Sequence, residues 1–292
     1  MSSQVRSRLW DAACVVLLAS LAVGLLWPVT LGGRTLLSTP LLLANDPWHA
    51  YLPQFEAELW RKGANWMSDP MYQFFPWRSY VNEELRRNTF PLWNPRQFFG
   101  TPFLANDQSQ VFYPDTWLLL PLPAEQAMGW SAALFLFLAG TFMFGFLRTL
   151  GCRHLAALIG AVAFMTNGYF VAWLNWPGIR AVIAWLPLIL LCYERAVRGR
   201  SLPWALAGAV AFCLQLLVGH MDMTIYLLIA FGLYALARAA LAARERGWRA
   251  GRWPLAALGI IVLLGSGLAT GQVLPALELG RVSTQLDLGH RQ

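Results

Sequence analysis

The segment from Asp69 to Pro114, DPMYQFFPWRSYVNEELRRNTFPLWNPRQFFGTPFLANDQSQVFYP, is the core of a polar, aromatic and proline-rich insert, Asp46 to Pro114, that lies between apolar runs. Prolines at this density interrupt helices, because proline lacks a backbone N–H and its ring clashes with the preceding turn. The segment belongs to a longer polar stretch, residues 32–127, which holds nine of the 15 acidic residues. We therefore predict a long, irregular loop between apolar helices, and loops of this length are usually functional.

The flanking sequence has the composition of a membrane protein. Of the 292 residues, 57% are hydrophobic and only 13% are charged, which excludes an ordinary soluble globular protein. A membrane-spanning helix needs about 20 largely apolar residues. Seven runs approach that length: 9–31, 128–147, 155–174, 181–197, 203–219, 223–243 and 254–274. The predicted fold class is an all-α integral membrane protein with about seven transmembrane helices and a large first extracytoplasmic loop.

The net charge of +7 does not indicate a nucleic-acid partner, because the arginines outside the loop gather at alternate ends of the predicted helices. Positive charge concentrates on the cytoplasmic side of membrane proteins. This rule places the N-terminus in the cytoplasm and the loop 32–127 outside. The arginines concerned are Arg6, Arg8, Arg148, Arg153, Arg195, Arg198, Arg200, Arg238, Arg244, Arg246, Arg249 and Arg252.

These patterns divide the chain into four parts. Residues 1–31 form the cytoplasmic N-terminus and a retained first helix, and residues 32–127 form the extracytoplasmic loop with the candidate active site. Residues 128–274 hold six further helices, and residues 275–292 begin a following extracytoplasmic segment. The four cysteines all lie in or beside apolar runs, so no disulfide framework or metal-spaced cluster is predicted in the loop.

Within the loop, an aspartate precedes a proline by seven positions three times: Asp46 to Pro53, Asp69 to Pro76 and Asp107 to Pro114. The first two begin as Asp-Pro, which is typical of a helix start, with the carboxylate capping free amides. After Pro76, apolar residues recur at helical spacing opposite a charged face that includes Arg78, so we predict an amphipathic helix. The apolar residues are Trp77, Tyr80, Val81 and Leu85.

Several segments together resemble the YfhO-type bacterial membrane proteins, a family grouped with the GT-C-fold glycosyltransferases. They are SDPMYQFFPW (68–77), FPLWNPRQFFGTPFLANDQSQVFYP (90–114), NGYFVAWLNWPGIRAVIAWLPLILLCYE (167–194), GHMDMTIY (219–226) and GQVLPALELGRVS (271–283). The resemblance covers nearly the whole chain. Proteins of that family are longer, so the resemblance implies an N-terminal fragment or a truncated member.

The resemblance implies an inverting enzyme that depends on an aspartate in the first extracytoplasmic loop. Asp69, followed by Gln73 and Pro76, matches the family pattern best, and Asp46 is the competing catalytic candidate. Such a carboxylate takes the proton of the acceptor hydroxyl or holds a divalent cation against the leaving phosphate. No other cofactor is implied. The structural alternatives for Asp69 are a helix cap and an ion pair with Arg78.

The other polar residues of this region are candidates for substrate contact, each with a structural alternative. Arginines suit a lipid phosphate, or they reach ordinary lipid headgroups. Amide side chains and aromatic faces suit a sugar, or they form a polar network that holds the loop together. The histidine lines a cavity, or it lies at a solvated hairpin tip beside Asp222. The candidates are Arg86, Arg87, Arg180, Trp93, Asn94, Asn106, Gln108, Gln110, Tyr113 and His220.

The predicted function is transfer of a sugar from a polyprenyl-phosphate donor to an envelope glycan or glycopolymer acceptor, on the outer face of the bacterial cytoplasmic membrane. No ATP-binding or dinucleotide motif occurs, which fits a donor activated beforehand on a lipid. A transporter or flippase for a lipid-linked glycan is the first alternative, and it predicts charged residues inside spans and paired broken helices. A non-catalytic scaffold for envelope assembly is the second.

Overall fold

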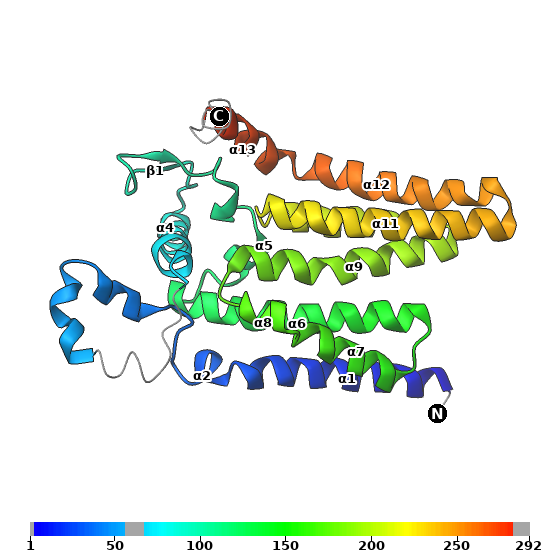
Figure 1. Ribbon diagram of the computed structural model, residues 1–292, viewed down its shortest axis with the longest axis horizontal. Helices are drawn as coiled ribbons and strands as arrows, with labels where there is room; N and C mark the ends of the chain where they lie inside the picture. The colour runs from blue at the N-terminus through cyan, green and yellow to red at the C-terminus, as the bar shows by residue number, and fades with distance from the viewer. Residues whose placement is uncertain (1–2, 56–66, 283–292) are drawn as a thin grey trace.

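The computed structural model describes residues 3–55 and 67–282, and it is a bundle of roughly parallel and antiparallel helices (Figure 1). The chain is a multi-pass, all-α membrane protein, as the composition predicts. Within the described residues, six helical stretches are long and apolar enough to cross a membrane. They are Gln4–Leu25, Ala124–Leu150, His154–Ala172, Pro177–Gly199, Met221–Arg246 and Trp248–Leu268.

These stretches correspond to a longer series of helical elements. The third is broken after Met165, and the sixth starts with a 3-10 turn, η5 (Trp248–Gly251). A further helix, α13, follows the sixth stretch. The helices of the bundle are α1 (Ser3–Leu25), α2 (Trp27–Thr30), α6 (Ala124–Leu150), α7 (His154–Met165), α8 (Gly168–Ala172), α9 (Pro177–Gly199), α10 (Leu202–Leu216), α11 (Met221–Arg246), α12 (Arg252–Leu268) and α13 (Thr270–Val282).

One of the seven predicted apolar runs, 203–219, extends from the end of the bundle where α9 ends to the loop end, but the helix it forms is shorter than the six candidate spans. This run forms α10, which has only 15 residues. At about 1.5 Å per residue, such a helix is shorter than the hydrocarbon core of a bilayer. The helix stops early because Gly219, with φ +78°, turns the chain back where the polar loop packs on it. Six stretches remain as candidate spans.

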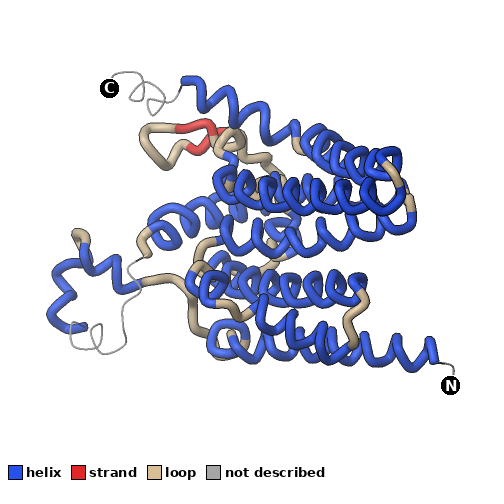
Figure 2. The backbone as a smooth tube through the Cα atoms, turned by 45° about the vertical axis from the view of Figure 1, so that its right-hand side comes forward, coloured by secondary structure: helices blue, strands red, loops and turns tan. Residues whose placement is uncertain are grey.

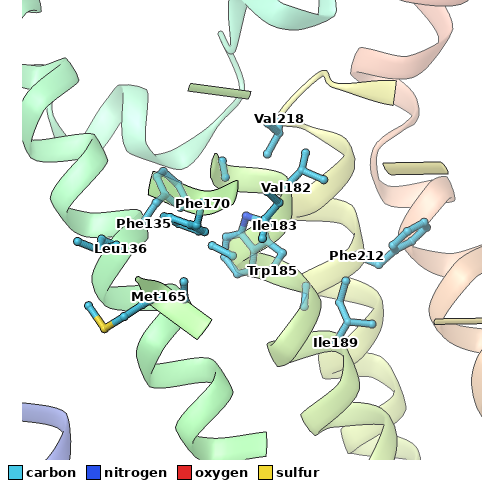
Figure 3. Close-up of a cluster of buried hydrophobic side chains, with 14 of the residues drawn as sticks. Phe135, Leu136, Met165, Phe170, Val182, Ile183, Trp185, Ile189, Phe212 and Val218 are labelled. Atoms are coloured by element: carbon cyan, nitrogen blue, oxygen red, sulfur yellow. The ribbon is translucent and has the colours of Figure 1, made fainter. Parts of the chain in front are cut away.

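Helix α9 lies at the centre of the bundle. In the most apolar part of α9, 67% of the residues are buried, against 17% in α1 and in α11, whose apolar side chains face outward. Figure 3 shows the core that α9 shares with α6, α7, α8 and α10. Its labelled side chains are Phe135, Leu136, Met165, Phe170, Val182, Ile183, Trp185, Ile189, Phe212 and Val218.

The loop elements gather at one end of the bundle, opposite the end that carries the N-terminus (Figure 1). In Figure 2 the two short strands, coloured red, lie at this loop end. They pair antiparallel, with Trp93 opposite Pro102. The elements are η1 (Thr39–Ala44), η2 (Trp48–Tyr51), the π-helical turn η3 (Pro70–Phe74), α4 (Phe75–Arg86), β1 (Trp93–Asn94), β2 (Thr101–Pro102), η4 (Asp107–Ser109) and α5 (Pro114–Leu118).

Helix α4 confirms the helix predicted after Pro76. Tyr80, Val81 and Leu85 are buried, and the Tyr80 ring packs edge-to-face on Phe103 with centroids 5.0 Å apart. The assignment of Arg78 to the exposed charged face is wrong: its side chain is only 10% exposed. Burial follows because α4 lies against the polar start of α5 and the start of α6, where Arg78 pairs with Asp115.

Candidate functional site

A small cavity lies at the loop end of the bundle, between η3 and α4 on one side and the first turns of α6 and α9 on the other. Its volume of about 20 Å³ is enough for one water-sized group. Loop and bundle both contribute to the lining. The lining residues are Phe74, Trp77, Arg78, Gln108, Ser109, Gln110, Asp115, Met128, Ser131, Pro177 and Arg180.

The cavity is bordered by two arginines and one carboxylate. Asp115 is 5% exposed, and its Oδ1 lies 3.4 Å from Nη1 of Arg78. Its Oδ2 accepts a hydrogen bond of 2.5 Å from the hydroxyl of Ser131, and Ser131 Oγ accepts one of 2.9 Å from Nη2 of Arg180. Arg180 is 1% exposed. The cluster therefore carries a net charge of +1 away from solvent.

This cluster leaves buried hydrogen-bond donors unused. Within the described part of the chain, Nε of Arg78 and Nε of Arg180 are buried and have no acceptor. A buried, charged N–H without an acceptor destabilises the protein, because the water it loses is not replaced. Pro177, the first residue of α9, also lines the cavity, so the positive end of that helix dipole faces the same space. The electrostatics favour a negatively charged group.

Next to the cavity, η4 packs on the turn between α10 and α11. A Cβ at Gly219 would lie 2.1 Å from the carbonyl oxygen of Asp107 and 2.7 Å from the amide nitrogen of Gln108. Only glycine allows both this close approach and the positive φ. The side chain of Gln108 lines the cavity, so the contact at Gly219 fixes the cavity wall against the bundle.

Asp107 is the titratable group of this junction. Burial, together with a smaller effect of the Asp222 charge, raises the pKa of Asp107 to about 6. His220 adjoins the first turn of α9 at Gly178. Burial lowers the pKa of His220, and among the described residues its buried Nδ1 has no partner. A carboxylate that titrates near neutral pH is suited to accept a proton during catalysis.

The predicted catalytic aspartates lie in the loop but do not line the cavity. Asp69 is half-buried, immediately before η3, and its Oδ1 accepts a hydrogen bond of 3.0 Å from the Ser68 hydroxyl. Its side chain makes no capping hydrogen bond, so the helix-cap alternative is wrong in this structure. The alternative ion pair with Arg78 is also wrong, because Arg78 pairs with Asp115. Gln73 is half-buried within η3.

Asp46 is exposed in the turn that precedes η2, where Pro47 and not Asp46 occupies the cap position. The neighbouring Asn45 donates through Nδ2 to the hydroxyl of Tyr72 at 2.5 Å, and that hydroxyl donates to the carbonyl oxygen of Leu41. These bonds join η1 to η3. The structure thus brings the segments that carry Asp46 and Asp69 together at the loop end of the bundle.

Of the three arginines predicted to meet a lipid phosphate, only Arg180 lines the cavity. Arg86 donates to the carbonyl oxygens of Leu120 (2.7 Å) and Leu122 (2.8 Å), just beyond α5. Arg87 pairs with Glu83 at 2.8 Å on the surface. These two arginines therefore stabilise the loop.

The predicted aromatic contacts separate into one buried and one exposed ring. Tyr113 is 1% exposed and stacks on Phe135 with centroids 5.8 Å apart, and its hydroxyl accepts from Trp185. Protein encloses the Tyr113 ring, so it offers no stacking face to a sugar in this structure. Trp93 is 53% exposed and covers Gly100, where a Cβ would lie 2.6 Å from the indole ring.

The predicted amide contacts mostly support turns. Asn94 accepts from the amide of Arg96 at 2.9 Å, and Asn106 accepts from the amide of Gln108 at 3.2 Å. Both bonds belong to the polar network that was the structural alternative. Gln110 donates to the carbonyl oxygen of Val218 at 3.2 Å, which is a second bond between the loop and the α10–α11 turn.

Sequence reasoning missed Arg78, Asp115 and Asp107 as site residues. Asp107 had a signal, because it begins the third Asp-to-Pro spacing of the loop. Among the described residues, no three His, Cys, Asp or Glu side chains gather closely enough to hold a metal ion. Comparison of the chain with protein-family models, curated proteins and solved structures finds no match. The site is therefore interpreted from its own chemistry.

Proposed function

We propose that this chain is a membrane glycosyltransferase that moves a sugar from a polyprenyl-phosphate donor to a cell-envelope acceptor on the outer face of the bacterial cytoplasmic membrane. The observation that carries the proposal is Asp107, whose pKa is raised to about 6 and whose next residue, Gln108, lines a buried cavity with a net positive charge. A base and an anion site side by side are what transfer from a lipid phosphate requires. The resemblance to YfhO-type proteins supplies the substrate class.

In the proposed reaction, the Asp107 carboxylate takes the proton of the acceptor hydroxyl. The hydroxyl oxygen forms a bond to the anomeric carbon of the donor sugar while the bond from that carbon to the phosphate oxygen breaks. The polyprenyl phosphate leaves with the negative charge. Arg180 and Arg78 stabilise that charge, because a preorganised cation stabilises charge that grows in the transition state. A cavity of about 20 Å³ admits a single phosphate oxygen and excludes the sugar.

Asp69 and Asp46 remain the alternative positions for the base. Both lie at the loop end of the bundle, and an acceptor bound there would have a carboxylate within reach. The proposal assigns proton transfer to whichever aspartate is the base.

Sugar transfer in membranes supplied with radiolabelled polyprenyl-phosphate sugars tests the proposal. Asp107→Asn, Asp69→Asn and Asp46→Asn are compared with wild type at matched expression. Glu125→Gln is the matched control, because Glu125 is an exposed carboxylate in the first turn of α6. We expect loss of transfer with Asp107→Asn alone. Loss with Asp69→Asn or Asp46→Asn alone would move the base to that residue. Unchanged transfer in all three variants contradicts the proposed chemistry.

One observation favours a transporter of lipid-linked glycan as the second candidate. Helix α9 carries two buried charged residues, Arg180 and Glu194, and the third apolar stretch is broken between α7 and α8. Glu194, however, is fully engaged by neighbouring side chains. Movement of a fluorescent lipid-linked glycan across proteoliposome membranes, in the absence of transfer with any donor, would favour the transporter. Neither transfer nor transport would favour an envelope-assembly scaffold.

A further inference from the structure

A second cavity lies at the opposite end of the bundle, between the last turn of α9, the last turns of α11, and η5 with the start of α12. Its volume is about 210 Å³. In Figure 1 this end is the one far from the loop elements, where the turn between α11 and α12 projects. The lining residues are Val197, Arg198, Arg200, Arg238, Leu241, Ala242, Glu245, Arg246, Ala250, Trp253 and Pro254.

The lining of this basic pocket carries four arginines and one glutamate. Beneath it, the fully buried Glu194 binds Arg198 at 2.9 Å and Arg238 at 2.7 Å. With both carboxylates counted against the four arginines, the pocket has an excess of two positive charges. Arg200 and Arg246 have no carboxylate partner within the described residues. These two guanidiniums are the ones left for a ligand.

The pocket combines this charge with an apolar rim at the level of the membrane surface. Leu241 is 47% exposed, and Trp253 anchors the rim by donating through Nε1 to the carbonyl oxygen of Ala196 at 2.8 Å. Trp248, at the tip of the α11–α12 turn, is 70% exposed. Tryptophans at helix ends mark the interface between hydrocarbon and water. The pocket therefore lies where lipid phosphates lie, between the ends of apolar helices.

Arg200 occupies an unusual backbone position. It ends α9 in the left-handed region, with φ 46° and ψ 43°, where glycine is the most favoured residue. A side chain at this position is strained. The same turn sets the Arg200 side chain in the pocket wall. Replacement by glycine would remove the charge and would also relieve the backbone strain, so a loss of binding could not be attributed to a loss of stability.

We propose that this basic pocket binds the headgroup of an anionic phospholipid, with Arg200 and Arg246 contacting the phosphodiester and the apolar rim contacting the start of the acyl chains. Basic pockets between membrane helices are suited to anionic headgroups. A soluble phosphate is the other source of the same chemistry, but the apolar rim and the position at the helix ends favour the lipid. The inference is independent of the transfer reaction, because the pocket lies at the other end of the bundle.

Native mass spectrometry of the full chain in detergent tests the proposal, with added phosphatidylglycerol, phosphatidylcholine or inorganic phosphate. The variant is Arg200→Gly combined with Arg246→Gln. The matched control is Arg244→Gln, which removes an exposed arginine of the same helix end that does not line the pocket. We expect wild type and control to retain phosphatidylglycerol in preference to phosphatidylcholine. The variant should lose about 25-fold in that preference, at roughly a factor of five for each arginine.

Three outcomes would overturn the proposal. Equal retention of the two lipids by wild type means that charge is not recognised. If Arg244→Gln loses as much of the preference for phosphatidylglycerol as the double variant does, the arginines attract the lipid only through their general positive charge and not through the pocket. Displacement of phosphatidylglycerol by millimolar inorganic phosphate assigns the pocket to a soluble anion. The thermal midpoint of the double variant, measured without added lipid, should match wild type and so separate loss of binding from loss of folding.

Discussion

Two buried charged clusters stand at opposite ends of helix α9, and each combines one carboxylate with two arginines. At the far end, Glu194 is 0% exposed and accepts hydrogen bonds from the Tyr234 hydroxyl, Arg198 and Arg238. Its arginine partners reach outward, with side chains 47% and 31% exposed. The excess positive charge of this cluster therefore lies in a polar environment, and both oxygens of the buried carboxylate accept hydrogen bonds.

The cluster at the loop end is arranged differently. Arg180 reaches Asp115 only through Ser131, and the second arginine, Arg78, is 10% exposed. The excess charge is buried here, and two guanidinium N–H groups have no acceptor among the described residues. At the far end, Nε of Arg238 also has no well-aligned acceptor in the described part of the chain, but it lies 2.7 Å from the Glu194 carboxylate. The difference in burial of the excess charge indicates that the far cluster stabilises the bundle, while the buried cluster next to a cavity is arranged for a ligand. Each cluster can be broken separately.

The largest expected effect comes from Arg180→Met. Methionine has a similar length and removes a buried charge whose donors are not all satisfied, so the thermal midpoint should be unchanged or higher. Transfer of sugar should fall by about 100-fold, because a cation that stabilises the leaving phosphate is lost. The measurement is the transfer rate per folded molecule, alongside thermal unfolding in detergent. A fall in stability with no fall in transfer would make this cluster structural as well.

For Glu194→Gln we expect the opposite result, a loss of stability without a loss of transfer. The change leaves two arginines without their carboxylate, and partial exposure limits the cost to about 2 kcal/mol, below that of a fully buried pair. The thermal midpoint should fall by roughly 5 °C. The transfer rate per folded molecule should equal that of wild type, because Glu194 lies at the other end of α9. A specific loss of transfer here would end the distinction between the two clusters.

The attachment of the loop to the bundle is tested by Gly219→Ala. A Cβ at this position would lie 2.1 Å from the Asp107 carbonyl oxygen, so the loop must move away from the α10–α11 turn. We expect a cost of about 2 kcal/mol, from the positive φ and the displaced contact together. Gly33→Ala is the control, because Gly33 has φ +68° but no atom within 4 Å of a Cβ, and should cost about 1 kcal/mol. Equal costs in the two variants would mean that the loop is not fixed at Gly219.

The sequence predicted what local patterns encode. Apolar runs predicted the spans, and the spacing from Trp77 to Leu85 predicted α4 almost to its ends. The site depends instead on contacts between segments far apart in the chain, such as Arg78 with Asp115 and Asp107 with Gly219. No spacing rule pairs such residues, because the irregular loop that brings them together is positioned by packing on the bundle.

The same limit explains the individual errors. The helical spacing places Arg78 on the charged face of α4, which was expected to be exposed. Arg78 is buried because it pairs with Asp115 at the start of α5. Arg180 was expected in the short loop before the run 181–197, but α9 begins at Pro177 and includes it. Its neighbours in the cavity come from α4, α5 and α6. The fifth apolar run, 203–219, was long enough by composition, and a backbone turn at Gly219 shortened the helix it forms.

The smallest expected effect, and the most specific, is on pH dependence. The pKa of Asp107 is raised from its ordinary 3.8 to about 6, so between these values the folded protein holds a proton that the unfolded chain releases. Its contribution to stability is therefore present below pH 4 and is lost as the pH rises through 6. Transfer needs the unprotonated carboxylate, so the rate should fall about tenfold for each pH unit below 6.

Stability and rate should thus change in opposite directions between pH 7 and pH 5. Thermal unfolding and initial transfer rates across this range measure the two. The difference between wild type and Asp107→Asn isolates the contribution of Asp107 to stability, because His220, whose pKa burial lowers, is present in both proteins. If Asp107 were only a buried structural carboxylate, the stability would change with pH but the transfer rate would not. Both pH dependences together identify Asp107 as the base, since they require a group that takes up a proton on folding below pH 6 and that must be unprotonated to accept a proton during transfer.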